Sequence, residues 1–170
     1  MTTLTTPKDL LAAVPFLIGF NPENSIVLLS LKNDAIAMAI RIDFPDQIGA
    51  DELKRLTSHL SRDSAESIIA IFYCLEIGQS QNEIISEILA AITDCGLSLR
   101  EVITVEGNRY RSLICEDLSC CPSQGNPLPE LIDSRIAAEQ VAQGRPIPFA
   151  TLELLIDSIS QLDSDDELID

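Results

Sequence analysis

The sequence predicts an α/β fold in which one mixed sheet of five strands is covered by helices. Short apolar runs at residues 26–31 and 67–74 have the length and composition of buried strands. Segments with apolar residues at helical spacing separate the runs, which is typical of strand–helix–strand units. Turn residues at Asn33-Asp34 and Gly107-Asn108 predict tight hairpins. The expected sheet therefore has a parallel core with antiparallel hairpins at both ends of the strand order.

The first helix is predicted to begin at Thr6, because Thr is a good N-cap and Pro7 suits the first helical position. Pro15 should bend or end this helix, and Gly19 should close it. Its buried stripe consists of Leu10, Leu11, Val14, Leu17 and Ile18.

Two strands joined at Asn33-Asp34 should follow, over residues 26–31 and 35–44. The first is apolar at every position except Ser30, which predicts burial on both faces. Pro45 should stop the second strand. A helix over residues 50–60 comes next, with Leu53, Leu56 and Leu60 as its core face.

The third strand is predicted at residues 67–74. A capping box from Ser80 to Glu83 should then start a helix that ends at Gly96. Two further strands, at residues 99–106 and 109–115, are joined by the turn at Gly107. Because right-handed crossovers link strands two, three and four, these three should be parallel.

A loop rich in Cys and Pro is expected at residues 115–129, before a short helix at 134–143. The last amphipathic helix carries Phe149, Leu152, Leu155, Ile156, Ile159 and Leu162. Residues 1–162 are therefore predicted to form a single α/β domain. Residues 163–170 are strongly acidic, and we expect a disordered tail.

The charge balance excludes several classes of partner. The chain has 11 Lys and Arg against 27 Asp and Glu, a formal net charge of -16. Such a surface repels phosphate backbones and anionic lipids, so we expect no nucleic acid and no membrane partner. The apolar run at residues 10–20 is too short to span a membrane and lacks a basic flank. We expect a cytoplasmic protein whose five cysteines begin as thiols.

Polar residues gather at one predicted edge of the sheet. Ligands in such sheets bind beyond the carboxyl ends of the parallel strands, and the loops before the reversed strands lie at the same end. We expect a small ligand-binding pocket there, for an anion or a carboxylate, and the alternative is an Arg–Asp pair that holds loops together. The residues concerned are Asn21, Asn24, Ser25, Arg41, Asp43, Asn108 and Arg109.

The cysteine-rich loop is a second candidate. Cys115, Cys120 and Cys121 should lie at the far end of the fifth strand, away from the polar edge. Adjacent cysteines are expected to point apart and a fourth ligand is not evident, so structural thiols are the leading interpretation. Zinc binding and a redox or regulatory thiol pair are the alternatives. Cys74 and Cys95 are expected in the core.

No catalytic motif is present. The chain lacks a Walker loop, a dinucleotide fingerprint, a zinc-protease helix and a nucleophile elbow, and His59 is its single histidine. The sequence therefore offers no case for catalysis, which leaves enzymatic activity an open question, and we expect no cofactor, with zinc as the alternative given above.

Several stretches resemble an uncharacterised bacterial family, the domain of unknown function number 4192. The resemblance runs through LLAAVPFLIGF (residues 10–20) with Pro22 and Ser25, RIDFP (41–45), NRY (108–110) with Ser112 and Cys115, CCP (120–122) with Gly125 and Pro127, Ala137-Ala138-Glu139, and Gly144-Arg145. This chain has Asn21 and Asn108 where the family often has His and Gly, and it lacks the family's Trp near Tyr110 and Arg111. The resemblance implies a fold and no activity.

Three functions are consistent with the sequence. The first is a small-ligand-binding or regulatory module at the polar edge. The second is a protein-interaction or homo-oligomerising domain that uses the edge strands and the last helix. The third is a thiol-redox or metal-binding protein that uses the loop with Cys115, Cys120 and Cys121.

Overall fold

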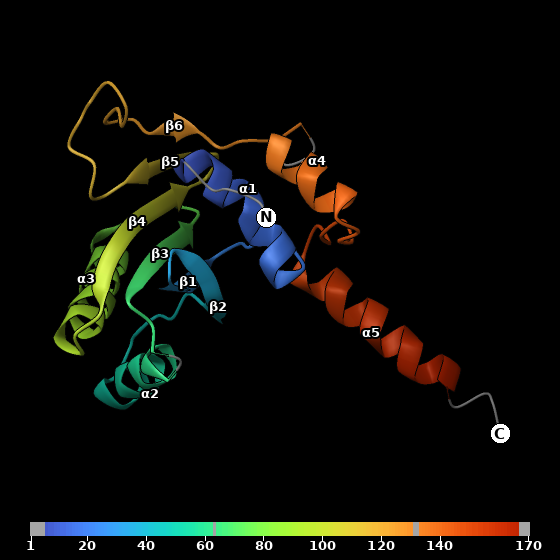
Figure 1. The fold of residues 1–170 in the computed structure, drawn as a ribbon. Helices are drawn as coiled ribbons and strands as arrows, with labels where there is room; N and C mark the ends of the chain where they lie inside the picture. The colour runs from blue at the N-terminus through green and yellow to red at the C-terminus, as the bar shows by residue number, and fades with distance from the viewer. Residues whose placement is uncertain (1–5, 63, 131–132, 167–170) are drawn as a thin grey trace. The chain divides into compact units, whose positions relative to one another are not determined.

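The computed structural model describes residues 6–62, 64–130 and 133–166. The chain divides into two compact units. The sheet unit comprises Asn24–Leu128, and the helical unit comprises Met1–Glu23 together with Pro129–Asp170. The order of helices and strands along the chain is drawn in Figure 1.

The sheet unit contains six strands in the spatial order β2-β1-β3-β4-β5-β6. Their bounds are β1 Ser25–Lys32, β2 Ala35–Asp43, β3 Ser67–Cys74, β4 Ser98–Glu106, β5 Arg109–Ser112 and β6 Asn126–Pro127. Two helices belong to this unit, α2 (Ala50–Ser61) and α3 (Gln79–Asp94). The mixed α/β architecture is therefore confirmed.

Two details of the predicted sheet are wrong. The sheet has six strands because the chain returns after the cysteine-rich loop and adds β6 beside β5. The parallel core is a single pair, β3 with β4, because β1 lies between β2 and β3 and is antiparallel to both. Strand β1 is apolar on both faces and thus suited to a central position, where it gains two hydrogen-bonded neighbours. Strands β2, β3 and β4 still point the same way, so their carboxyl ends share one edge.

The core of the sheet unit lies between one face of the sheet and helices α2 and α3 (Figure 1). Alternate strand residues face these helices, as the two-residue period of a strand requires. Each large apolar side chain buried there contributes roughly 1.5–3 kcal/mol to folding. The fully buried members of this cluster are Ile26, Leu28, Leu60, Ile68, Ala70, Phe72, Ile88 and Ile92.

Both helices of the sheet unit begin at a glycine N-cap. Glu52 Oε2 accepts the backbone N–H of Gly49 at 2.8 Å, and Gln81 Oε1 accepts that of Gly78 at 3.1 Å. The expected start at Ser80 is therefore wrong, because Gln81 reaches back to Gly78 and starts α3 earlier. Cys95 follows the end of α3 and is exposed, which contradicts its expected place in the core, whereas Cys74 is buried as expected.

The helical unit contains α1 (Pro7–Ile18), α4 (Arg135–Ala142) and α5 (Leu152–Asp166). Thr6 caps α1, since its Oγ accepts the N–H of Asp9 at 3.1 Å. The helix continues past Pro15 and ends at Gly19, which adopts a left-handed φ of 92°. Ala12 and Ala13 of α1 pack against Ile136 of α4.

Helix α5 begins after a short parallel bridge between Phe20 and Phe149. The N–H of Asn21 donates to the Phe149 carbonyl at 3.0 Å, and the Phe149 N–H donates to Gly19 at 2.9 Å. The helix reaches Asp166 and so includes the first part of the range expected to be a tail. Residues 167–170 of that range lie outside the described residues. Among the described helices, none combines the length and apolar character needed to cross a bilayer.

Candidate functional site

The predicted polar edge brings three of its residues into direct contact. Ser25 stands at the start of β1, opposite Asp43 at the end of β2. Arg41 donates from Nε and Nη2 to Ser25 Oγ at 3.0 and 2.8 Å, and its Nη2 lies 2.6 Å from Asp43 Oδ1. The Arg41 side chain is only 17% exposed. Its guanidinium is thus engaged by the two neighbouring strands.

The other residues of this prediction have separate places. Asn24 adopts a φ of 40°, and its carbonyl accepts the N–H of Phe44 at 2.9 Å. Asn108 turns β4 into β5, and its carbonyl accepts the N–H of Leu128 at 2.8 Å. Asn21 belongs to the helical unit.

Arg109 lies on the opposite flank of the sheet from Arg41. Their strands, β5 and β2, are separated by β1, β3 and β4. At about 4.8 Å for each interstrand spacing, four spacings put them roughly 19 Å apart. Arg109 Nη1 instead donates to the Gly125 carbonyl at 2.8 Å, in the cysteine-rich loop. The structure therefore assigns Arg109 to that loop rather than to a pocket with Arg41.

The three loop cysteines converge. The Sγ atoms of Cys115, Cys120 and Cys121 all lie within 4.8 Å of one another, and those of Cys120 and Cys121 are 4.0 Å apart. We call this group the thiol cluster. The expectation that Cys120 and Cys121 point apart is wrong, because side chains alternate only in extended chain. Here the N–H groups of Cys120 and Cys121 both donate to the Asp117 carbonyl, at 3.1 and 2.7 Å, and the chain turns.

Ser112 fixes the entry to the loop and explains why β5 ends there, three residues before the predicted end. Its buried Oγ accepts the N–H groups of Ile114 at 3.2 Å and of Cys115 at 3.1 Å. The same Oγ donates to Glu101 Oε1 of β4 at 2.6 Å. These bonds turn the chain away from the sheet and hold the backbone of Cys115.

Asp117 organises the next turn. Its Oδ1 accepts both the N–H and the Oγ–H of Ser119, at 2.9 and 2.7 Å. The side-chain hydrogen bond from Ser119 is the main reason why the pKa of Asp117 is lowered. An ionised Asp117 thus stabilises the turn that presents Cys120 and Cys121.

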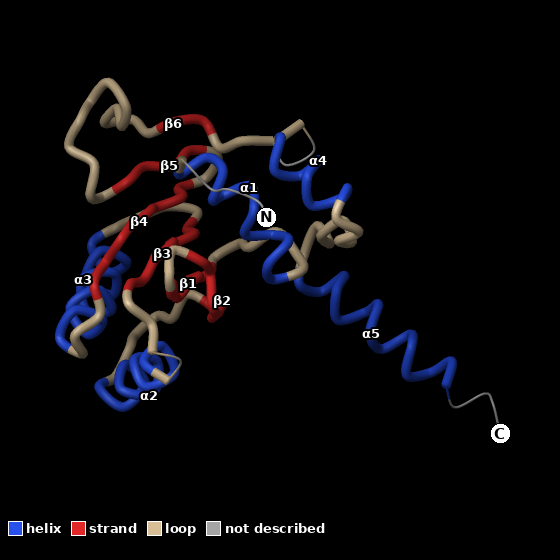
Figure 2. Tube along the Cα trace, in the orientation of Figure 1, coloured by secondary structure: helices blue, strands red, loops and turns tan. Residues whose placement is uncertain are grey.

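The end of the loop is tied back to β5. Arg111 Nη1 donates to the Ser123 carbonyl at 3.3 Å, and Asn126 Nδ2 donates to the Cys120 carbonyl at 2.9 Å. Gly125 has a φ of 77°, and a Cβ there would lie 2.9 Å from the Tyr110 carbonyl oxygen. Only glycine fits this close approach without a shift of the backbone. Figure 2 shows the loop between β5 and β6 in tan.

The members of the thiol cluster differ in exposure. Cys121 is buried, Cys115 is half-buried and Cys120 is exposed. Burial, together with hydrogen bonds to the thiols of Cys115 and Cys120, raises the pKa of Cys121 to about 12. Burial also raises the pKa of Tyr110, and the charges of the Cys121 and Cys120 thiolates add to that effect. In the metal-free protein Cys121 is therefore a protonated thiol near neutral pH.

One sulfur pair of the cluster has nearly the spacing of two zinc-bound thiolates. Zinc–sulfur bonds of about 2.3 Å at tetrahedral angles place two sulfurs roughly 3.8 Å apart. The 4.0 Å between the sulfurs of Cys120 and Cys121 is close to that value. Among the residues that the structure describes, the cluster offers three ligands, which leaves a fourth position for water or an added ligand.

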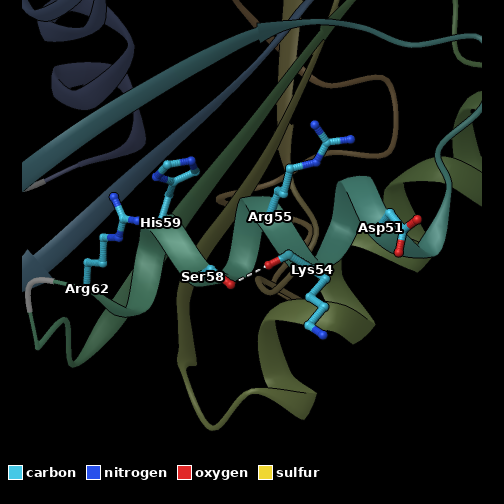
Figure 3. Close-up of a pocket in the computed structure, with 6 residues that line it drawn as sticks. All are labelled: Asp51, Lys54, Arg55, Ser58, His59 and Arg62. Carbon is cyan, nitrogen blue, oxygen red and sulfur yellow. Dashed lines mark hydrogen bonds between the residues drawn. The ribbon is translucent and has the colours of Figure 1, made fainter.

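The sequence reasoning missed a second feature, on helix α2. The exposed side chains of Lys54, Arg55, His59 and Arg62 line a surface hollow of about 450 Å³ together with Asp51 and Ser58 (Figure 3). The available signal was the spacing of Lys54, Arg55 and His59 along the helix predicted over residues 50–60, with Arg62 just beyond its end. The strongly negative net charge of the chain hid this signal, because a net charge does not show where the positively charged side chains lie.

Comparison with known families covers nearly the whole chain. The model of the family described as Domain of unknown function (DUF4192) matches residues 7–168. The chain belongs to this family. The thiol cluster and the Arg41–Ser25–Asp43 contacts both lie inside the matched region. A search of the curated proteins finds no match.

Proposed function

We propose that this DUF4192 protein is a metal-binding module that holds a thiophilic ion, zinc first, through Cys115, Cys120 and Cys121. The observation that carries the proposal is the approach of all three Sγ atoms to within 4.8 Å of one another. Three thiolates favour soft or borderline ions, such as zinc or monovalent copper, over magnesium or calcium.

The hydrogen bonds around the thiol cluster support a metal site that is preformed in the absence of the ion. The backbone at Cys115 is held by Ser112, the turn at Cys120 and Cys121 by Asp117, and the loop end by Arg109. Such outer contacts orient ligands and stabilise the bound ion. A bound cation also deprotonates a coordinating thiol, which offsets the raised pKa of Cys121.

A redox function of the same cysteines is the second candidate, supported by the approach of the Cys115 and Cys121 Sγ atoms to within 4.8 Å of each other. Two features make it weaker. A protonated, buried thiol is a poor nucleophile. Adjacent residues also have Cα atoms only about 3.8 Å apart, less than the 4.4–6.8 Å usual for a disulfide, which disfavours a Cys120–Cys121 bond.

The small-ligand pocket at the polar edge stays a prediction and ranks lower. The Arg41 guanidinium, its main anion-binding group, already contacts Ser25 and Asp43. That arrangement favours the alternative in which these residues hold two strands together.

The test is reconstitution under anaerobic conditions with zinc or with cobalt(II) as a spectroscopic probe. The wild-type chain should bind one ion and show thiolate-to-cobalt charge-transfer absorption. Cys115→Ser, Cys120→Ser and Cys121→Ser should each lose at least about tenfold in affinity. Cys95→Ser, which alters an exposed thiol outside the cluster, is the matched control and should bind as the wild type does. Equal binding by all four variants would refute the proposal.

A disulfide, by contrast, is tested by thiol titration after mild oxidation. Loss of two thiols from the wild-type chain without any metal binding would favour the redox candidate. Persistence of all thiols alongside stoichiometric metal favours the metal-binding module.

A further inference from the structure

Helix α2 exposes a concentration of positive charge in a strongly acidic chain. Lys54, Arg55 and Arg62 are exposed, and none of them forms an ion pair with any residue that the structure describes. Arg41, Arg100 and Arg135, by contrast, pair with carboxylates. We call Lys54, Arg55, His59 and Arg62 the basic stripe. In Figure 3, Arg55, His59 and Arg62 extend from the same side of the helix.

The shape of the hollow indicates an elongated partner. Five of its six lining residues lie in α2 and the sixth, Arg62, is the C-cap of that helix, so none of the lining residues forms an opposing wall that would enclose a small molecule. A partner that lies along the helix can reach several of these side chains at once. The aliphatic stems of Lys and Arg also offer apolar area beside their charges.

The C-terminal part of the chain has the complementary chemistry. The chain has no basic residue after Arg145, whereas residues 163–170 hold five carboxylates. Within α5, Glu153 and Asp157 are exposed. The helix also exposes large apolar side chains, namely Leu154 at 49%, Ile156 at 51%, Ile159 at 52% and Leu162 at 68%. An acidic helix with exposed apolar residues matches cations carried on aliphatic stems.

We propose that the acidic C-terminal segment of one copy, residues 152–170, docks along the basic stripe of α2 in a second copy. A nucleic acid is the less favoured occupant, because a net charge of -16 repels a phosphate backbone at long range. The contact joins two different surfaces, and its reciprocal exchange between two copies gives a closed dimer.

The test is sedimentation velocity of the full-length protein over a wide concentration range, at low and high salt. The wild type should dimerise, more weakly at high salt because the contact is largely ionic. The variant Lys54→Glu/Arg55→Glu/Arg62→Glu should raise the dissociation constant at least about tenfold. Replacing Glu153, Asp157, Asp163, Asp165 and Asp166 by Lys in that variant changes the side-chain charge of the segment from -7 to +3. This second reversal should restore dimerisation, which also shows that the chain still folds.

The matched control makes the same change of net charge elsewhere. Lys8, Lys32 and Arg145 are exposed and lie outside α2, so their replacement by Glu should leave the dissociation constant within about threefold of wild type once salt screens the difference in net charge. Three outcomes would overturn the proposal: a wild type that is monomeric throughout, dimerisation that survives reversal of the basic stripe, or binding of a DNA oligonucleotide that only the stripe variant loses.

Discussion

The guanidinium of Arg109 donates a 2.8 Å hydrogen bond to the carbonyl of Gly125, which joins the first residue of β5 to the residue before β6. This bond closes the loop that carries Cys115, Cys120 and Cys121. A long loop is held in one conformation only if its ends and turns are fixed, because the entropy of the free chain opposes order. The closure is therefore a precondition for bringing three thiols together.

Gly125→Ala should disturb the thiol cluster through the backbone. The new Cβ would lie 2.9 Å from the Tyr110 carbonyl, and the φ of 77° is unfavourable for alanine. We expect a loss of about 2–4 kcal/mol in the free energy of unfolding, and weaker zinc binding. Gly107→Ala is the control, since Gly107 has a φ of 58° but open space around it. Its loss should be about 1 kcal/mol, measured by urea unfolding. Equal losses in the two variants would show that the contact with Tyr110 has no effect.

Ser112→Ala should loosen the entry to the loop. It removes the acceptor for the N–H groups of Ile114 and Cys115 and the donor to Glu101. Because Ser112 is buried, we expect a loss of about 1–3 kcal/mol in stability and a lower zinc affinity. The control is Ser98→Ala, whose hydroxyl makes one exposed bond to the Glu66 carbonyl. It should cost less stability and leave zinc affinity as in wild type. Unchanged affinity in Ser112→Ala would remove this residue from the site.

Arg41→Ala distinguishes a structural role of the polar edge from a ligand pocket. The substitution leaves Ser25 Oγ and Asp43 without the guanidinium, so unfolding should become easier by about 1–3 kcal/mol. Asp43→Asn should have a smaller effect because its side chain is 83% exposed. If Arg41→Ala keeps full stability but abolishes thermal stabilisation by a small anion, the pocket interpretation is right and the structural one is wrong.

Stability in the absence of metal should fall in alkaline solution, in part through Cys121. Its pKa is raised from 9.0 to about 12 in the folded chain, so between these values the folded state binds more protons than the unfolded state. The slope of the unfolding free energy with pH is then negative, and the contribution is full below pH 9.0 and lost towards pH 12. Urea unfolding at several pH values above 9.0 should show a shallower fall for Cys121→Ser. Parallel curves for the two proteins would contradict this assignment.

Local sequence signals predicted most helices and strands, because capping residues, turn residues and apolar period are local. The run of β1, apolar from Ile26 to Leu31 except at Ser30, even indicated burial on both faces. The insertion of β1 between β2 and β3 could not be predicted, since the sequence of a strand does not show which strands lie beside it in the sheet. Strand β6 was missed because two residues, Asn126 and Pro127, show no period.

For the candidate site too, local features could be predicted from the sequence and contacts between distant residues could not. The cysteines could be named from their spacing in the sequence, but their convergence depends on Asp117 turning the chain and on Arg109 reaching Gly125. Those contacts join residues 16 apart or depend on turn geometry, which composition does not reveal. Arg109 was assigned to the wrong partner set for the same reason. The usable signal was the spacing of Arg109 and Arg111, which are two residues apart and therefore lie on the same face of their strand.

X-ray absorption at the zinc edge of the anaerobically reconstituted protein tests the proposed metal site most directly. We expect three sulfur scatterers at about 2.3 Å and one lighter ligand, with one sulfur fewer in Cys120→Ser. A shell of oxygen and nitrogen alone, unchanged by that substitution, would contradict it.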